Sequence, residues 1–226
     1  MKIIFTNTLD QEKYPLEKPQ PADRYIPEWY KDLTSYKNTN KELDEKGDSI
    51  GTIKKCIPVF DVITAGYIIT SPAELYVDGN HKFYWPNAGL ISFHPVWQAP
   101  THPLFNGLQY PKFMNPWAIK TPKGYSTLFV QPFHRPSVFT ILPGIVDTDL
   151  YTATINFPFV LNDPLFKGFI PKGTPIAQVI PFKRESWTSE LGNKKDVDYS
   201  LAQREEVRSS FYDYYKRAWH QKKQYK

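Results

Sequence analysis

Two aspartates and one arginine are the residues whose types and spacing are best suited to chemistry. Asp147 and Asp149 lie in the stretch Leu142–Phe182, which gathers acidic, amide and glycine residues within an aromatic and proline-rich region. Carboxylates two residues apart in an extended segment point to one face, where they repel unless a cation, an arginine or a ligand donor lies between them. Since Arg135 is the nearest arginine in motif order, we expect it to contact Asp147 or Asp149 beside a concave ligand site.

Metal-binding motifs with regular spacing are absent. The histidines form no His-x-His, His-x-Asp/Glu or HExxH pattern. An iron site of two histidines and one carboxylate could still be assembled from His94, His102 or His134 with Asp147 or Asp149. Proline follows two of these histidines directly and the third after one residue, which favours structural turn positions. The sequence therefore predicts no metal site, and an iron-dependent jelly-roll oxygenase stays a second alternative.

Nucleophilic and nucleotide-loop motifs are also missing. The single cysteine, Cys56, cannot form an internal disulfide and suits an inert core position. No serine lies in a GxSxG elbow, and neither the P-loop nor GxGxxG occurs. Folds that bind ATP or dinucleotides through those loops are thereby excluded.

Four segments occur in an order that resembles the trimeric dUTPase and dCTP deaminase superfamily. They are Ala65-Gly66-Tyr67, Pro132-Phe133-His134-Arg135-Pro136-Ser137, Gly144-Ile145-Val146-Asp147-Thr148-Asp149 and Gly173-Thr174-Pro175-Ile176-Ala177-Gln178-Val179-Ile180. In that superfamily the corresponding segments line one nucleotide site on a distorted jelly roll. The resemblance covers about half of the chain.

The resemblance implies roles for the matching residues. Arg135 and Ser137 would face phosphate, and Gln178 would hydrogen-bond near it. Asp147 would position or activate the attacking water, as the catalytic residue, with Asp149 beside it in the ligand site. A carboxylate that orients water beside an arginine that balances phosphate charge suits pyrophosphate hydrolysis.

The chain departs from the superfamily pattern in four features. Ile68 stands where the superfamily has the aspartate that holds magnesium through water. Leu150 occupies the place of the tyrosine that stacks on deoxyribose, although Tyr151 follows directly and is included among the expected ligand-binding residues. No glutamate follows within Tyr151–Ile155, and a glycine-rich terminal flap is missing. With these departures, the resemblance assigns the chain neither an enzymatic activity nor a cofactor.

The whole chain also resembles an uncharacterised protein family of tailed phages of marine cyanobacteria. The stretches IPEWYKDL, GYSTLF, VDTD and GTPIAQVIPF carry this likeness. It implies a phage source and no activity.

The composition predicts an all-β protein. Of 226 residues, 41% are hydrophobic and 16% aromatic, and 21 prolines and 11 glycines punctuate the chain. Aromatic residues favour pleated, half-buried surfaces, and short strands between frequent turns are typical of sandwiches and jelly rolls. From Ile53 to Trp187 the pattern predicts strands throughout. Trp117–Lys120 and Tyr125–Val130 are expected to meet across the turn Thr121–Gly124.

Three segments make up the predicted organisation. Residues 1–52 form an N-terminal arm and polar loop, 53–188 a distorted jelly roll or β-sandwich, and 189–226 one amphipathic C-terminal α-helix with a basic tail. A capping box over Ser200–Gln203 predicts that the helix begins near Ser200. Its apolar positions continue through Phe211 to Trp219.

The basic tail accounts for most of the net charge. Residues Asp213–Lys226 supply +4 of the net +5. The rest is nearly neutral, so nucleic-acid binding is expected only through this tail. The tail has no large aliphatic side chain after Trp219, so we expect it to lie in solvent and add little stability. The N-terminus predicts no membrane segment, which suggests the cytoplasm of an infected host cell.

Two classes of function lead. The first is a nucleotide-binding or nucleotide-processing protein of dUTPase-like layout, with a nucleotide as partner and a homo-oligomer as its expected form. The alternative is a non-enzymatic virion or interaction protein, in which the glycines serve turns and the aspartates cap local backbone.

Overall fold

The computed structural model describes residues 1–9, 16–37, 51–86, 89–99, 101–103, 109–209 and 214–226. In these ranges more residues lie in strands than in helices, and the strands form several antiparallel sheets. The predicted all-β class with one long C-terminal helix is confirmed. None of the helices in these ranges is long and apolar enough to span a membrane.

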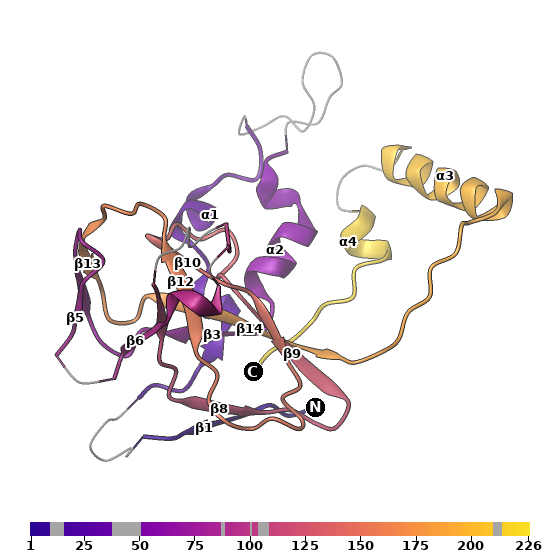
Figure 1. The fold of residues 1–226 in the computed structure, drawn as a ribbon. Coiled ribbons are helices and arrows are strands. Elements are labelled where there is room, and N and C mark those ends of the chain that lie inside the picture. Colours follow the sequence, from indigo (N-terminus) through magenta and orange to yellow (C-terminus); the bar gives the residue numbers. More distant parts are fainter. Residues whose placement is uncertain (10–15, 38–50, 87–88, 100, 104–108, 210–213) are drawn as a thin grey trace. The chain divides into compact units, whose positions relative to one another are not determined.

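Two compact units divide the chain. The β unit comprises Met1–Pro27, Val62–Arg184 and Tyr225–Lys226, and the helical unit comprises Glu28–Asp61 and Glu185–Gln224. The arm and loop predicted over residues 1–52 are thus shared between the units. Figure 1 shows the course of the chain through both.

Four antiparallel sheets are seen in the described part of the β unit. The five-stranded sheet has the order β11 (Gly144–Val146), β9 (Tyr125–Val130), β14 (Pro175–Lys183), β3 (Tyr67–Thr70) and β2 (Gln20–Pro21). The others are β10 (Phe139–Ile141)–β12 (Phe157–Leu161)–β7 (Tyr110–Phe113)–β6 (Ile91–His94), β13 (Lys167–Ile170)–β4 (Leu75–Asp78)–β5 (Phe83–Tyr84), and β1 (Ile4–Asn7)–β8 (Trp117–Lys120). Short 3₁₀ turns η1 (Ala22–Tyr25) and η3 (Val96–Gln98) complete the unit.

Phenylalanine rings form the centre of the core. Phe113 stacks on Phe159 with ring centroids 4.3 Å apart, and Phe139 lies 4.9 Å from Phe113. In β12 the alternation of Phe157, Phe159 and Leu161 buries every second side chain. Pro158 is tolerated inside this strand because β12 pairs with β7 at residues 157–158 and with β10 from Phe159 onward.

The turn Thr121–Gly124 connects two sheets, so the predicted pairing of its flanking strands is wrong. Strand β8 pairs with β1, whereas β9 pairs with β11 and β14. The turn lies one residue later than predicted, since Tyr125 N donates to Pro122 O over 3.2 Å and Gly124 has a φ of +82°. Strand identity followed from local pattern, but partner choice depends on distant segments.

A helix replaces the strand expected after Ile53. Helix α2 spans Ile57–Thr64, directly after the 3₁₀ turn η2 (Ile53–Lys55). Its β-branched residues favour a strand, but Pro58 lies in the first helical turn, where its missing N–H costs no hydrogen bond. Side-chain hydrogen bonds to the last carbonyl groups of the helix stabilise α2.

The helical unit contains α1 (Glu28–Asp32), η2, the start of α2, α3 (Lys194–Ser209) and α4 (Tyr214–Ala218). The expected start of the long helix near Ser200 is wrong, since α3 begins six residues earlier. Asn193 Oδ1 accepts from Lys195 N over 2.8 Å, and Asp196 Oδ2 accepts from Asn193 N over 2.7 Å. This reciprocal arrangement is a capping box. Phe211 lies outside the described residues.

The C-terminal tail is docked, contrary to its expected position in solvent. In the helical unit Lys223 Nζ lies 2.7 Å and His220 Nε2 3.0 Å from Asp61 Oδ2. In the β unit Tyr225 packs edge-on against Tyr67, with centroids 5.8 Å apart, and joins the core. The tail has no large aliphatic side chain, but the ring of Tyr225 supplies apolar surface that can be buried.

Candidate functional site

The two aspartates lie in a turn that follows the edge strand β11. Val146 pairs with Thr127 of β9, and the chain then turns so that Leu150 N and Tyr151 N both donate to Asp147 O, over 2.9 and 2.8 Å. Thr148, between the aspartates, is buried. Its hydroxyl lies 2.8 Å from Thr121 Oγ1 and 2.7 Å from Thr127 Oγ1. This buried anchor fixes the two carboxylates on either side of it.

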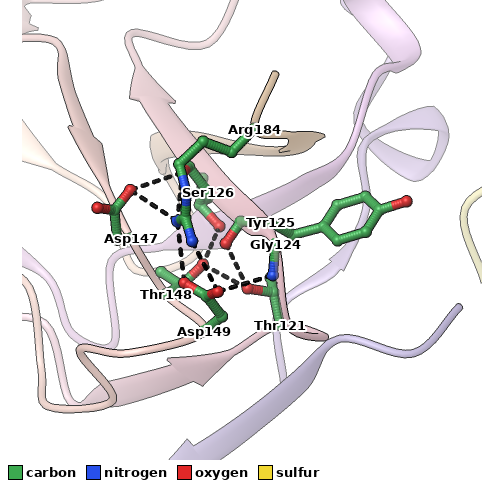
Figure 2. A network of polar contacts seen from close by, with 9 residues as sticks. Thr121, Gly124, Tyr125, Ser126, Asp147, Thr148, Asp149 and Arg184 are labelled. Carbon is green, nitrogen blue, oxygen red and sulfur yellow. Dashed lines mark hydrogen bonds and ion pairs between the residues drawn. The ribbon is translucent and has the colours of Figure 1, made fainter. Parts of the chain in front are cut away.

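Arg184, directly after β14, joins both carboxylates. Its Nη1 lies 3.0 Å from Asp147 Oδ1, and its two terminal nitrogens hold Asp149 through bonds of 3.0 and 2.9 Å. Ser126 Oγ donates to Asp147 Oδ1 over 2.6 Å, and Gly124 N donates to Asp149 Oδ2 over 2.7 Å. We call these five residues the Asp147 corner (Figure 2).

Hydrogen bonds keep both carboxylates ionised. The Ser126 hydroxyl, followed by Arg184, lowers the pKa of Asp147, and Arg184, followed by the Gly124 amide, lowers the pKa of Asp149. The same contact with Asp149 raises the pKa of Arg184. With two negative charges and one positive charge, the Asp147 corner carries a net charge of about −1 at neutral pH.

Asp147 and Asp149 differ in their access to solvent. The Asp149 side chain is 3% exposed, whereas that of Asp147 is 52% exposed. Both bonds of Asp147 are made by Oδ1, and its Oδ2 has no hydrogen-bond partner among the described residues (Figure 2). An ionised oxygen held in this way can accept a hydrogen bond from a hydroxyl, an amine or water. Its lowered pKa makes it a weak base.

Arg135 and Gln178 lie at a different place, the C-terminal end of α2. Gln178 Nε2 donates to Val62 O over 2.8 Å and to Ala65 O over 2.7 Å. Arg135 Nη2 donates to Ile63 O over 3.4 Å. The last carbonyls of a helix have no partner within it, so these two side chains satisfy groups that would otherwise be unpaired. We call this arrangement the α2 cap.

Both side chains of the α2 cap bond to the backbone of this fold. Gln178 is fully buried, and its Oε1 accepts from Phe133 N over 3.1 Å, so both amide hydrogens and the amide oxygen are engaged within the fold. The second long bond of Arg135 Nη2 goes to Ala22 O at 3.4 Å. Its Nε is buried without a partner among the described residues, and burial lowers the pKa of Arg135 to about 10.

Gly66 completes the end of the helix. It has a φ of +70°, and an added Cβ would overlap the backbone oxygen of Val179 in β14. Only glycine fits such a left-handed position beside another backbone. Three of the four motif segments therefore meet in a structural joint between α2 and β14.

The predicted contact of Arg135 with the aspartates is wrong, because Arg184 takes that place. Gln178 and Arg184 are six residues apart along an extended strand, roughly 20 Å at the usual rise. The structure thus brings Asp147, Asp149 and Tyr151 together and places Gln178 elsewhere. No local sequence pattern pointed to Arg184, because its place depends on the antiparallel register of β14 with β9, which sets Lys183 opposite Tyr125.

The remaining predicted site residues are Ser137 and Tyr151. Ser137 Oγ accepts from Phe139 N over 3.2 Å at the start of β10. Tyr151 is 51% exposed beside Asp147. Ile68, which stands in place of the metal-holding aspartate of the resembled superfamily, is fully buried in β3.

No metal centre is seen among the residues that the structure describes. Groups of three or more His, Cys, Asp or Glu in a metal-binding arrangement are not found there. His94, one of the predicted iron ligands, stacks on Tyr110 with centroids 4.8 Å apart and hydrogen-bonds Gln98. The iron-oxygenase alternative therefore has no assembled ligand set in this part of the chain.

The chain is similar to solved structures of phage dUTPases. A mutant dUTPase from phage phi11 of S. aureus, with a structural Mg(II) ion, matches with a TM-score of 0.37 and 12% identity, covering 85% of this chain and 96% of its own. The Staphylococcus bacteriophage 80alpha dUTPase has a TM-score of 0.36 and 14% identity over 85% and 95% of the two chains. A mutant of it with dUpNHpp has a TM-score of 0.38, 13% identity and the same coverage.

No family model and no curated protein matches the sequence.

Proposed function

We propose that the chain binds a nucleotide at the Asp147 corner and does not hydrolyse its pyrophosphate. The observation that carries this proposal is the open Oδ2 of Asp147, an ionised acceptor whose side chain is 52% exposed and is held in place by Ser126 and Arg184. Such an oxygen suits a sugar hydroxyl. The resemblance of Gly144–Asp149 to a nucleotide-site segment supports the choice of ligand.

Tyr151 supplies a second element of the proposed site. It is 51% exposed, and its amide donates to the carbonyl oxygen of Asp147. An aromatic ring tied to the backbone of the binding carboxylate can stack on a base or a sugar. Asp149 supports the site indirectly, since it holds the guanidinium of Arg184.

Hydrolysis is not part of the proposal because the described residues around the Asp147 corner do not include the groups that it needs. Ile68 supplies no ligand for the magnesium that would balance triphosphate charge. Gln178 is engaged in the α2 cap, as is Arg135. The low pKa of Asp147 further disfavours proton abstraction from water. Water positioning by Asp147 stays a prediction from the resemblance.

The α2 cap favours the alternative of a non-enzymatic virion or interaction protein. Arg135 and Gln178, two residues that the resemblance assigns to ligand, bond to backbone carbonyls instead. A jelly roll that retains these residues for structure alone would need no nucleotide.

Calorimetry decides between these functions. We expect dUTP, dCTP or one of their monophosphates to bind the wild type, and Asp147→Asn to weaken binding at least about tenfold through loss of a charged acceptor. Asp23→Asn is the matched control, since Asp23 is an exposed aspartate of η1. Absence of heat with all four nucleotides would overturn the proposal and favour the interaction protein.

A further inference from the structure

A row of three aromatic rings crosses the outer face of the sheet β13–β4–β5. Tyr76 of β4 pairs in register with Tyr84 of β5 on one side and with Phe169 of β13 on the other. The ring centroids are 6.2 Å apart for Tyr76–Tyr84 and 4.9 Å apart for Tyr76–Phe169. Three rings that are direct cross-strand neighbours form one continuous apolar strip.

The strip points away from the core. Leu75 and Val77, which flank Tyr76 in β4, are fully buried, and Ile170 and Phe83 are buried in the neighbouring strands. Side chains alternate between the faces of a strand, so the aromatic row lies on the opposite face. Tyr84 is 52% and Phe169 61% exposed. Contiguous exposed aromatic surface of this kind marks an interaction site.

Charges of both signs surround the strip. Asp78 shares the face of Tyr76 by strand alternation, and Lys167 shares that of Phe169. Glu74, directly before β4, is exposed. Lys82 is exposed beside β5. Asp78 is held in place because its Oδ1 accepts from Asn80 N and from Lys82 N over 2.8 and 3.2 Å, and these bonds help to lower its pKa. Two acidic and two basic residues leave the face close to neutral.

We propose that this face packs against the same face of a second copy of the chain about a two-fold axis. An isologous contact needs a surface that is complementary to itself. A neutral face with both signs can place each charge opposite its counterpart, and an aromatic centre with a charged rim is the usual anatomy of a protein interface. A polyanion such as nucleic acid needs a net positive rim, which this face lacks.

Sedimentation equilibrium of the full chain tests the proposal. We expect the wild type to associate with increasing concentration, and the double variant Tyr84→Ser, Phe169→Ser to raise the dissociation constant at least about tenfold, since aromatic anchors dominate such contacts. Trp97→Ser is the matched control, because Trp97 is 74% exposed outside the strip and its loss should leave association unchanged. Circular dichroism checks that each variant is folded.

Charge variants keep the test decisive if the double serine variant fails to fold. The acidic variant Lys82→Glu, Lys167→Glu and the basic variant Glu74→Lys should each associate less well than the wild type, and an equimolar mixture should regain association. A wild type that stays monomeric up to about 1 mM, well above the Kd of specific complexes, would overturn the proposal. So would unchanged association of both charge variants, or a strip that binds single-stranded DNA instead.

Discussion

At the end of β11, Asp147 exposes half of its side chain, and one of its oxygens has no hydrogen-bond partner in the part of the chain that the structure describes. At the end of α2, by contrast, the amide of Gln178 is fully buried and fully bonded. Both regions come from segments that resemble one nucleotide site. The two regions differ in burial and in hydrogen bonding. An open, ionised oxygen can serve a ligand, but a buried amide that satisfies three backbone groups stabilises the fold.

The cation in each region shows the same contrast. Arg184 meets two carboxylates at about the usual charged hydrogen-bond length. Arg135 meets only carbonyl oxygens at 3.4 Å, and burial lowers its pKa. An arginine at a helix C-terminus interacts favourably with the negative end of the helix dipole. Residue type alone therefore does not tell a ligand-binding arginine from a capping one.

The largest expected effect is on the α2 cap, from Gly66→Ala. The new Cβ would overlap the Val179 backbone, and φ is +70°. We expect a loss of more than about 3 kcal/mol in the free energy of unfolding, or no folded protein. Gly173→Ala is the matched control, since Gly173 has a φ of +85° but open space around it, and should cost only about 1–2 kcal/mol. If chemical denaturation showed equal losses in the free energy of unfolding for the two variants, the close approach of Gly66 to β14 would be contradicted.

Gln178→Leu should be the next most harmful change. It leaves Phe133 N, Val62 O and Ala65 O without their side-chain partner in the interior. We expect a loss of about 3 kcal/mol, because unsatisfied buried groups keep their full desolvation cost. Gln203→Leu on α3 is the control and should stay within about 0.5 kcal/mol. Thermal unfolding at equal midpoints for the two variants would show that the cap is dispensable.

Asp147→Asn should barely change the free energy of unfolding, in contrast to the substitutions at the α2 cap. Asp147 is half exposed, and surface ion pairs contribute little to stability. We therefore expect a shift in Tm of only a few degrees. A large drop would mean that the Asp147 corner is a structural network like the α2 cap.

The smallest effect should appear in the pH dependence of Arg184→Gln. The pKa values of Asp147 and Asp149 are lowered in the folded protein. Their contribution is therefore present above the unfolded value, about 3.9, and is lost as pH falls through the lowered folded values. The difference in Tm between wild type and Arg184→Gln should shrink from pH 7 to pH 2. A difference that grows on acidification would contradict this assignment.

The local sequence pattern predicted the strands better than it predicted which distant segments lie together. The strands Trp117–Lys120 and Tyr125–Val130 and the shared place of Asp147 and Asp149 followed from residues near one another in sequence. Arg184 did not, because its place opposite Gly124 depends on the register of β14 with β9. The helix over Ile57–Thr64 was missed since its β-branched residues favour a strand, while its stabilising partner Gln178 lies more than a hundred residues away.

The most direct test compares binding by Arg135→Met and Asp147→Asn in calorimetry with the nucleotide that binds the wild type. The two changes remove, respectively, the arginine of the α2 cap and the open carboxylate of the Asp147 corner. We predict that folded Arg135→Met keeps the wild-type affinity within about threefold, whereas Asp147→Asn loses at least about tenfold. Loss of binding in folded Arg135→Met, with binding retained in Asp147→Asn, would contradict the account.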